Sequence, residues 1–323
     1  MLNQEVYDKV AAEFAAKFGA APAAVAYAPG RIEVLGNHTD YNEGYVFSAA
    51  IDKGTFFAAS LADDDKVTLV ALDMGETYET TLAAVAKVES GATWANYPLG
   101  TFNWLFGGEP AKAGKGFKAV FGGNIPLGAG LSSSAALEMA TALALQKLYG
   151  TSFGKTELAK IGQKAEHTFA GCPCGLLDQA SSMYGQAGAL VKSDFRSNEF
   201  ESVKMGDGVA FMMVKSNAKH ALVDGAYASR RKACEDAAKH FAGVLRKPVT
   251  HLRDVTMAEW VLYHDGLDET TARRAVHPIG EDERVLQGAA LLEKGDLKGF
   301  GALMYDSHES SRRWFEKIGR AHV

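Results

Sequence analysis

The sequence predicts an α+β fold, because short apolar runs come first in the chain and helical patterns come later. Four apolar runs, separated by turns that contain Gly or Asp, predict strands of one sheet at residues 25–28, 46–52, 55–59 and 67–72. Beyond Tyr227 the pattern is mainly helical, and helices are expected at residues 230–241, 257–263, 281–292 and 297–308. The chain shows no internal repeat and no low-complexity linker.

The remaining stretches complete the expected order of elements. Residues 1–20 carry charges at helical spacing, so they predict an amphipathic helix; a signal peptide would need an uninterrupted apolar region. Further helices are expected at residues 94–106 and 133–149, and two more around Asp178, the first at about residues 156–170. Further strands are expected at residues 117–121, 189–193 and 209–214.

Composition limits the kinds of partner that the protein can have. Its 323 residues suffice for two domains of ordinary size. Lys and Arg number 34 against 39 Asp and Glu, which gives a net charge of −5 and no broadly basic surface for nucleic acid. No run of about 18 apolar residues predicts a membrane span, and three cysteines cannot form a disulfide framework. We therefore expect a cytoplasmic protein that binds neither nucleic acid nor membranes. We also expect a monomer, although nothing in the composition determines the oligomeric state.

A Gly- and Ser-rich stretch at residues 124–139 is the strongest functional signal in the sequence. Glycine lets backbone N–H groups approach an anion closely, and a helix N-terminus offers unpaired donors and a partial positive charge. The stretch therefore predicts a phosphate loop; the alternative is an ordinary Gly-Ser turn that caps a helix. It matches neither the G-x-x-x-x-G-K-[ST] loop nor the G-x-G-x-x-G dinucleotide fingerprint. The residues concerned are Gly128, Gly130, Ser132, Ser133 and Ser134.

The order of residues in this loop resembles the second motif of the GHMP small-molecule kinases. That resemblance implies that these two glycines and three serines bind the phosphates of ATP. It also implies that Trp94 lies near the adenine, because Trp-Ala-Asn-Tyr at residues 94–97 is similar to a family segment. The alternative for Trp94 is a core aromatic residue on an amphipathic helix.

A polar cluster within residues 28–44 narrows the resemblance to the galactokinase branch. The stretch Gly-Arg-Ile-Glu-Val-Leu-Gly-Asn-His-Thr-Asp-Tyr-Asn is very similar to the branch pattern Gly-Arg-x-Asn-Leu-Ile-Gly-Glu-His-Thr-Asp-Tyr-Asn. Its many directional hydrogen-bonding groups suit a sugar polyol; the alternative is a polar loop between two strands. The resemblance implies that Asn37, His38 and Asp40 bind the sugar, and that Arg31 is catalytic.

Residues 171–182 look like the galactokinase stretch around the catalytic aspartate, which corresponds to Asp178. The resemblance also makes Glu166 and Ser134 the pair that binds Mg²⁺, an ion that typically keeps few protein ligands beside waters and phosphates. The two cysteines in this stretch, with one more far along the chain, lack a matching Cys/His pair, so no zinc site is expected.

The implied reaction is the ATP-dependent phosphorylation of the anomeric hydroxyl of galactose to galactose 1-phosphate. Phosphoryl transfer depends mainly on positioning and on neutralising charge. The resemblance implies that Asp178 orients the sugar hydroxyl and accepts its proton late, and that Arg31 contacts both Asp178 and the transferred group. Gly175, through its backbone, and Tyr227 would complete the sugar contacts. A packing role is the alternative for Tyr227.

One position departs from the family pattern and keeps other substrates open. Asn37 stands where galactokinases have a glutamate that contacts the 6-hydroxyl of the sugar, so hydrogen bonding remains but the charge is lost. We expect a broader preference at that carbon. The alternatives are a related sugar-1-kinase that acts on arabinose, a uronic acid or an N-acetylhexosamine, and a non-catalytic sensor of sugar and ATP. A sensor needs no phosphoryl-transfer pair, which argues against it.

The resemblance further implies a two-domain GHMP kinase fold. Residues 1–205 would form an N-terminal domain like ribosomal protein S5 domain 2, which carries the phosphate loop and the sugar motif. Residues 206–323 would form a ferredoxin-like C-terminal domain, truncated because the third, glycine-rich family motif is absent. We also expect that residues 318–323 are not native, because they match one reading frame of a sequencing-adapter oligonucleotide.

Overall fold

The computed structural model describes residues 3–126, 128–214 and 226–316, except the side chains of residues 226 and 227. It divides into two compact units, the first made of Met1–Arg31 and Ala50–Tyr184, the second of Ile32–Ala49 and Gly185–Val323. The predicted division between residues 205 and 206 follows the family's domains and stays a prediction. Residues 318–323, which we predict not to be native, lie outside the described residues. We describe each unit in turn.

The sheet of the first unit is built around β5, which lies between β2 and β3. β5 runs antiparallel to β2 and parallel to β3, and β4 pairs antiparallel with β3 at the edge. β1 pairs with β2. The strands are β1 (Ala24–Leu35), β2 (Tyr45–Leu61), β3 (Lys66–Ala71), β4 (Glu76–Thr81) and β5 (Phe117–Gly123); β1 and β2 also contribute residues to the second unit.

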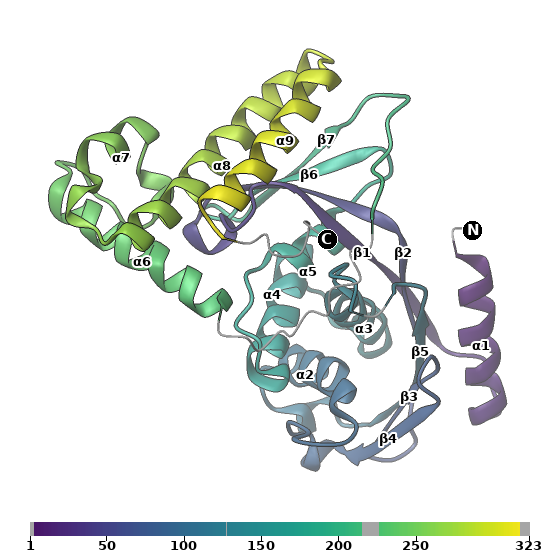
Figure 1. The fold of residues 1–323 in the computed structure, drawn as a ribbon. Coiled ribbons are helices and arrows are strands. Elements are labelled where there is room, and N and C mark those ends of the chain that lie inside the picture. The colour runs from purple at the N-terminus through teal and green to yellow at the C-terminus, as the bar shows by residue number, and fades with distance from the viewer. Residues whose placement is uncertain (1–2, 127, 215–225, 317–323) are drawn as a thin grey trace. The chain divides into compact units, whose positions relative to one another are not determined.

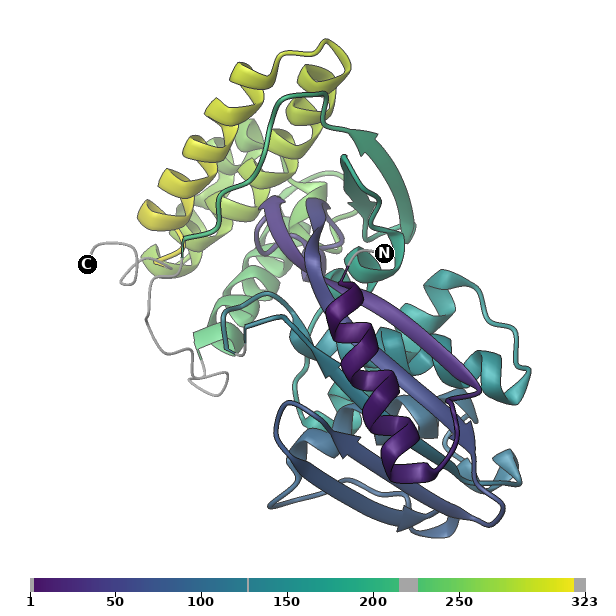
Figure 2. The ribbon, with the colours of Figure 1, turned by 90° about the vertical axis from the view of Figure 1, so that its right-hand side faces the viewer.

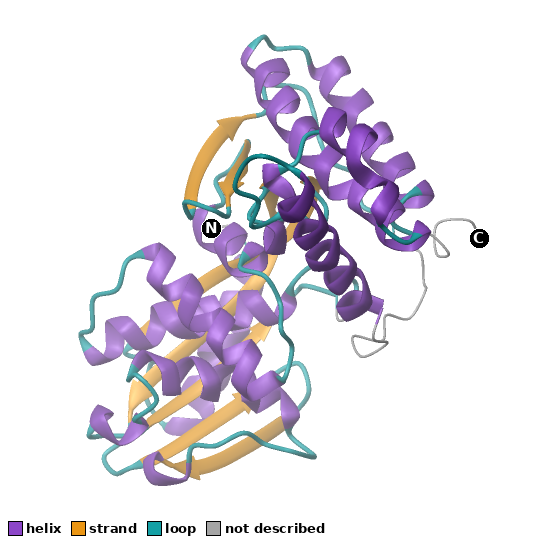
Figure 3. Ribbon diagram, turned by 90° about the vertical axis from the view of Figure 1, so that its left-hand side faces the viewer, coloured by secondary structure: helices purple, strands orange, loops and turns teal. Residues whose placement is uncertain are grey.

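Helices cover both faces of this sheet (Figures 1 and 3). The predicted amphipathic helix α1 lies along one face, as Figure 2 shows, with Val10 and Phe14 packed among apolar strand residues such as Phe56 and Val120. Four helices cover the other face: α2 (Asn96–Leu105), α3 (Ser133–Tyr149), α4 (Lys155–Ala165) and α5 (Leu177–Tyr184), while α1 spans Gln4–Phe18. The bounds of α3 are those that the sequence predicts.

Some predicted elements of this unit differ in detail from the structure. The strands expected at residues 46–52 and 55–59 are one continuous strand, β2. Gly54 of this strand lets β1 pass close to it, because a Cβ there would lie 2.4 Å from the carbonyl oxygen of Ala28 in β1. The helix expected at about residues 156–170 changes at Glu166 into a five-residue π-helix, Glu166–Ala170, a geometry that is frequent at functional sites.

In the described residues, the second unit carries β6 and β7, which continue the sheet from β2, together with the helices α6 to α9. The first residues of β2 pair antiparallel with β6, and β6 pairs antiparallel with β7. Phe47 of β2 packs with Val285 of α8 and Phe300 of α9 in one core cluster, and α6 contributes Phe241 to another. The elements are β6 (Ala189–Asp194), β7 (Glu199–Lys204), α6 (Ala226–Val244), α7 (Met257–Tyr263), α8 (Glu269–Glu293) and α9 (Leu297–Arg313).

The prediction of a strand at residues 209–214 is wrong. These residues have no regular structure, and Met212 and Val214 are 88% and 79% exposed. The strand that pairs with β6 is instead β7, where Phe200 and Val203 stand among exposed polar residues, so that an apolar-run criterion misses it. Short 3₁₀ turns occur at Asp40–Asn42, Leu82–Ala84, Thr93–Ala95, Pro110–Ala113, Leu252–Asp254 and His264–Gly266.

The described elements confirm the mixed α+β class. None of the helices that the structure describes is both long and apolar enough to cross a membrane.

Candidate functional site

The predicted phosphate loop leads directly into helix α3. Gly128 and Gly130 have φ values of 67° and 73°, a region that glycine adopts without strain. A Cβ at either glycine would meet no described heavy atom within 4 Å. The backbone conformation, and not crowding, therefore calls for glycine here, and the loop has open space beside it for a ligand.

Ser132 stands at the N-cap of α3 but does not cap the helix with its side chain. It adopts a left-handed conformation with φ 56°, which is uncommon for a residue with a side chain. Its hydroxyl instead donates a 2.6 Å hydrogen bond to Oδ2 of Asp178. A residue held in such a conformation by long-range contacts is typical of functional sites.

Arg31 and Asp178 form a partly buried ion pair in the first unit. Their side chains are 15% and 24% exposed. A second guanidinium nitrogen of Arg31 donates to the carbonyl oxygen of Gly130 at 2.9 Å. Gly30 permits this approach of β1 to the loop, since a Cβ there would lie 2.5 Å from the carbonyl oxygen of Leu131. The structure thus joins both predicted catalytic residues to the phosphate loop.

Glu166 is buried at the start of the π-helix, with its carboxylate held on one side. Its Oε2 accepts hydrogen bonds from Nε2 of Gln179 at 2.9 Å and from Sγ of Cys174 at 2.8 Å. The same amide nitrogen donates to Glu138, whose pKa burial raises well above its ordinary value, with Glu166 adding repulsion. Gln179 follows Asp178 directly in the sequence, but sequence reasoning missed it.

The oxygen ligands available at Glu166 and Ser134 suit a Mg²⁺ ion whose other ligands are phosphate and water. No group of three or more His, Cys, Asp or Glu side chains that could enclose a metal occurs in the described ranges. Glu166 has no hydrogen bond through Oε1 to any described residue, so that oxygen is the one it can offer to a cation. Ser134, the second residue of α3, is half-buried. A carboxylate oxygen and a hydroxyl are ligands that suit Mg²⁺.

Trp94 lies half-buried just before α2. Its Nε1 donates to Oε2 of Glu76 at 2.5 Å, and its ring is tilted against Phe121 at 5.5 Å between centroids. Trp94 is therefore not a fully buried core residue on a helix, and its role near adenine stays a prediction.

The predicted sugar residues Asn37, His38 and Asp40 lie on one loop of the second unit, between β1 and β2. His38 has φ 66° and is only 9% exposed, and its ring packs against that of Phe315 at 4.7 Å between centroids. Asp40 is half-buried and begins a 3₁₀ turn. A histidine in this strained, buried position is held by the fold around it.

Asn37 is bonded to a second residue of the same motif. Its Nδ2 donates to Oε2 of Glu33 at 2.8 Å. The galactokinase pattern has Asn at position 33 and Glu at position 37, so this chain exchanges the two and keeps the carboxylate beside the amide. The signal was present in the motif, but sequence reasoning considered only Asn37.

Two consecutive buried acids of α8 hold this loop, and sequence reasoning missed both. Oε2 of Glu281 accepts from the backbone N–H groups of Gly36 and Asn37 at 2.7 and 3.0 Å. Oδ1 of Asp282 accepts from the backbone N–H of Tyr45 at 2.6 Å. Glu281 is fully buried and Asp282 is 9% exposed. One turn of α8 therefore anchors both ends of the predicted sugar loop.

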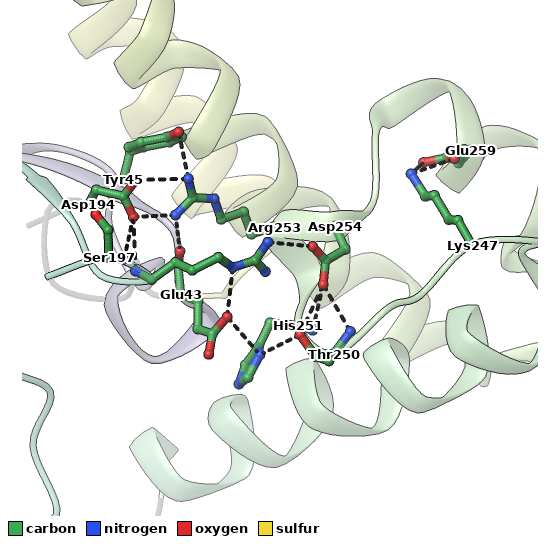
Figure 4. Close-up of polar contacts among 11 residues, drawn as sticks. Glu43, Tyr45, Asp194, Ser197, Lys247, Thr250, His251, Arg253, Asp254 and Glu259 are labelled. Atoms are coloured by element: carbon green, nitrogen blue, oxygen red, sulfur yellow. Dashed lines mark hydrogen bonds and ion pairs between the residues drawn. The ribbon is translucent and has the colours of Figure 1, made fainter.

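An ion-pair network supports the far end of the same loop (Figure 4). Arg253 donates to the backbone oxygen of Glu43 at 2.7 Å and to the hydroxyl of Tyr45 at 2.6 Å, and it pairs with Asp194 at the end of β6. The Arg253 guanidinium helps to hold the pKa of Asp194 below its ordinary value, against the effect of burial. Arg196 adds a second bridge, from Glu43 to Asp254.

Gly175 and Tyr227 are the last two residues predicted to bind the sugar, and the structure describes only the first of them fully. Gly175 lies half-buried in the first unit, in the stretch that precedes α5. Tyr227 is the second residue of α6, and its side chain lies outside the described residues. Their roles stay predictions.

We expect Asp282 to make the stability of the protein depend on pH. Burial, with repulsion from Glu281 and Asp194, raises its pKa to about 7, although the backbone N–H of Tyr45 and the Arg253 charge act in the opposite direction. A pKa raised in the folded state stabilises the fold fully below the unfolded value, near 3.9 for Asp, and this stabilisation is lost as pH rises through 7. Each unit of difference corresponds to about 1.4 kcal/mol.

The variant Asp282→Asn tests this expectation, because asparagine is neutral and keeps an acceptor for Tyr45. Urea unfolding from pH 4 to pH 8 should show the variant gaining stability relative to the wild type as pH rises. Asp306→Asn, at an exposed position of α9, is the matched control and should show a constant difference. A constant difference for Asp282→Asn as well would contradict the raised pKa.

Two family models match the segments of the chain that carry the predicted motifs. The family model for the GHMP kinases N terminal domain matches residues 96–186, which include the phosphate loop and Asp178. The galactokinase galactose-binding signature matches residues 12–61, which include Arg31 and the loop from Asn37 to Asp40.

Similar proteins extend the match over most of the chain. The chain is 40% identical to the galactokinase of Pasteurella multocida (strain Pm70), over 94% of this chain and 78% of that protein. The structure of Lactococcus lactis galactokinase complexed with galactose matches with a TM-score of 0.83 at 31% identity, over 96% of this chain and 80% of that one. Mevalonate kinase of Methanococcus jannaschii shares the fold, with a TM-score of 0.55 at 18% identity over 92% and 80%. The chain therefore has the GHMP kinase fold, and it belongs to the galactokinase family of phosphotransferases that act on alcohol groups.

Proposed function

We propose that the protein transfers the γ-phosphoryl group of ATP to the anomeric hydroxyl of galactose. The observation that carries this proposal is the partly buried Arg31–Asp178 pair, which Ser132 and the carbonyl oxygen of Gly130 join to the phosphate loop. A cation and a carboxylate beside a phosphate cradle are what in-line transfer to a hydroxyl group requires. A protein that only bound sugar and ATP would not need this pair.

ATP is proposed to bind with its phosphates along the loop that ends at Ser134. A kinase that uses ATP requires a metal ion with it, and we propose Mg²⁺, held by Glu166 and Ser134. When bound, this ion neutralises charge on the phosphate oxygens. Two observations support this assignment: the open space beside Gly128 and Gly130, and the oxygen Oε1 of Glu166, which has no hydrogen bond to a described residue. The proposed ATP-binding residues are Trp94, Gly128, Gly130, Ser132, Ser133 and Ser134.

Within this proposal Asp178 orients the acceptor hydroxyl and takes its proton as the bond to phosphorus forms. The ion pair with Arg31 and the hydrogen bond from Ser132 hold the two carboxylate oxygens of Asp178 in place, so the group is preorganised. Arg31 stabilises negative charge on the transferred group. The sugar is proposed to be bound by Asn37, His38, Asp40, Gly175 and Tyr227.

Galactose is the proposed acceptor, and a related aldose is the second candidate. The 2.8 Å bond between Asn37 and Glu33 favours the second candidate, since the amide and the carboxylate stand at each other's positions in the family pattern. A sugar that differs from galactose at C5 or C6, such as arabinose or galacturonate, would respond to this exchange.

A coupled assay for ADP with a panel of aldoses tests the proposal. We expect Mg²⁺-dependent release of ADP that requires the sugar, with the largest kcat/KM for galactose and measurable values for arabinose and galacturonate. Strict selectivity for galactose would remove the broader preference at C6 and leave the kinase assignment intact. Absence of turnover with every aldose, at saturating Mg²⁺ and ATP, would contradict the proposed function.

Cellular location and assembly follow as further proposals. Cys172 and Cys174 are half-buried free thiols and Cys234 is a buried one, which fits a reducing cytoplasm. The expectation of a monomer stays a prediction, which light scattering of the purified chain would check.

A further inference from the structure

Gln179 occupies a buried position among the helices that carry the proposed metal and transfer residues. Its side chain is fully buried, and its Nε2 lies 2.9 Å from Oε2 of Glu138 and 2.9 Å from Oε2 of Glu166. A primary amide has two N–H groups, so each carboxylate receives one of them. One side chain of α5 therefore bridges an acid of α3 and an acid at the end of α4.

This bridge makes the two oxygens of Glu166 unequal. Oε2 accepts from Gln179 and from the thiol of Cys174, at 2.9 and 2.8 Å. A carboxylate held by two donors through one oxygen is fixed in rotation, and it presents its other oxygen in one direction. Partners that hold a metal ligand in this way commonly change metal affinity when they are removed.

The bridge also links the elements that carry the other proposed residues. Glu138 lies four residues after Ser134 on α3, so the two side chains share one face of that helix. Asp178 and Gln179 are consecutive in the first turn of α5, where neighbouring side chains point about 100° apart. Gln179 thus connects the helix of Ser134, the residue Glu166 and the turn that holds Asp178.

Tight packing keeps the bridge in place. Gly162 of α4 lies directly against it, since a Cβ there would come within 3.1 Å of both Gln179 Cγ and Glu138 Oε2, and within 2.5 Å of Met139. A side chain at position 162 would displace the bridge. The absence of one lets α4 approach closely enough for the two carboxylates to share a single amide.

We propose that Gln179 is a positioning residue that fixes the metal-binding oxygen of Glu166 relative to Asp178. This inference rests on the proposed function, in which Glu166 binds the cation that accompanies ATP. Because Gln179 is fully buried, we propose that it acts through Glu166 and not by direct contact with a substrate. Its loss should therefore weaken the contribution of the metal to ATP binding and leave the binding of metal-free ATP unchanged.

The variant Gln179→Met tests this, because methionine keeps the length of the side chain and removes both N–H groups. Calorimetric titration with ATP in EDTA and with ATP in Mg²⁺ separates the two contributions to binding. We expect metal-free ATP to bind within about twofold of the wild type. We expect the apparent dissociation constant of Mg²⁺ to rise about 10- to 100-fold. The dissociation constant of Mn²⁺, measured by electron paramagnetic resonance with ATP present, should rise by the same factor.

Two further variants keep the test decisive. The double variant Glu138→Leu/Gln179→Met also removes Glu138, the buried acid that would otherwise lose its hydrogen-bond donor. It should therefore fold even if Gln179→Met alone does not. We expect it to show the same loss of metal binding. Gln163→Met, the matched control, removes a half-buried glutamine of α4 that donates to the carbonyl oxygen of Cys174 at 3.3 Å, and should leave metal binding unchanged.

The outcomes separate this inference from the proposed function. The positioning role would be overturned if a folded Gln179 variant had unchanged dissociation constants for Mg²⁺ and Mn²⁺. It would also be overturned if the binding of metal-free ATP and of metal-bound ATP were weakened equally. Failure of the wild type to phosphorylate any aldose would overturn the proposed function instead, while the metal-binding measurements would still report on Gln179.

Discussion

Replacing Asp178 with asparagine is expected to lower kcat by about 10²- to 10⁴-fold, the range typical for loss of a positioned acid or base. Asp178 accepts from Arg31 and from Ser132 on different oxygens. An asparagine amide has one oxygen and two N–H groups, so it would turn a donor toward either Arg31 or Ser132. The variant would also lose the ability to accept the proton of the sugar hydroxyl.

The measurement is steady-state kinetics with galactose, together with calorimetric binding of MgATP. We expect the dissociation constant of MgATP to stay within a few-fold of the wild type, because Asp178 faces the acceptor in the proposed mechanism. Asp63→Asn, an exposed substitution in the turn before β3, is the matched control and should retain full activity. Near-normal turnover of Asp178→Asn would refute its catalytic assignment.

Truncation of Glu281 to alanine is expected to cost about 3–5 kcal/mol of unfolding free energy, the usual range for breaking a buried charged pair. The fully buried carboxylate accepts from Arg284, from Ser307 and from two backbone N–H groups of the sugar loop. Its removal leaves these donors buried without a partner. The loop from Gly36 to His38, which includes a residue with positive φ, would lose its anchor.

Denaturant unfolding and the KM for galactose measure the two consequences. The variant Glu281→Gln keeps the shape of the side chain and one of its two acceptor oxygens. Its loss of stability should therefore be smaller than that of Glu281→Ala. Glu283→Ala, at an exposed position on the same helix, is the matched control and should change stability by less than about 0.5 kcal/mol. A comparably small effect for Glu281→Ala would show that the acid does not hold the loop.

Much of the fold could be predicted because its signals are local. The helix of residues 133–149 begins after a glycine-rich loop and ends at Gly150 in a left-handed conformation, which is the usual helix stop. Edge strands were less accessible to prediction. β4 and β7 consist largely of exposed polar residues, so their pairing with β3 and β6 leaves little trace in hydrophobic pattern.

The candidate site divides in the same way. The contact between Arg31 and Asp178, 147 residues apart, was expected only through resemblance to a known family, and it is present in the structure. Their catalytic roles stay predictions. Glu33 was visible in the motif and was overlooked. Glu281 and Asp282 gave no local signal, because two acids within a helix look the same in sequence whether they face water or a loop more than 200 residues away.

The sequence by itself determined that this chain carries a phosphate loop at the start of a helix and a polar motif of the kind that suits a sugar, whereas the role of Asp178 came from resemblance to a known family. These are properties of short segments, since backbone conformation and hydrogen-bonding chemistry depend on neighbouring residues. Only the tertiary structure decided that Ser132 serves Asp178 instead of capping its helix, that Gln179 joins two acids, and that α8 anchors the sugar loop. A buried polar group must find a partner wherever the fold supplies one, and in these examples that partner lies between 13 and 245 residues away along the chain.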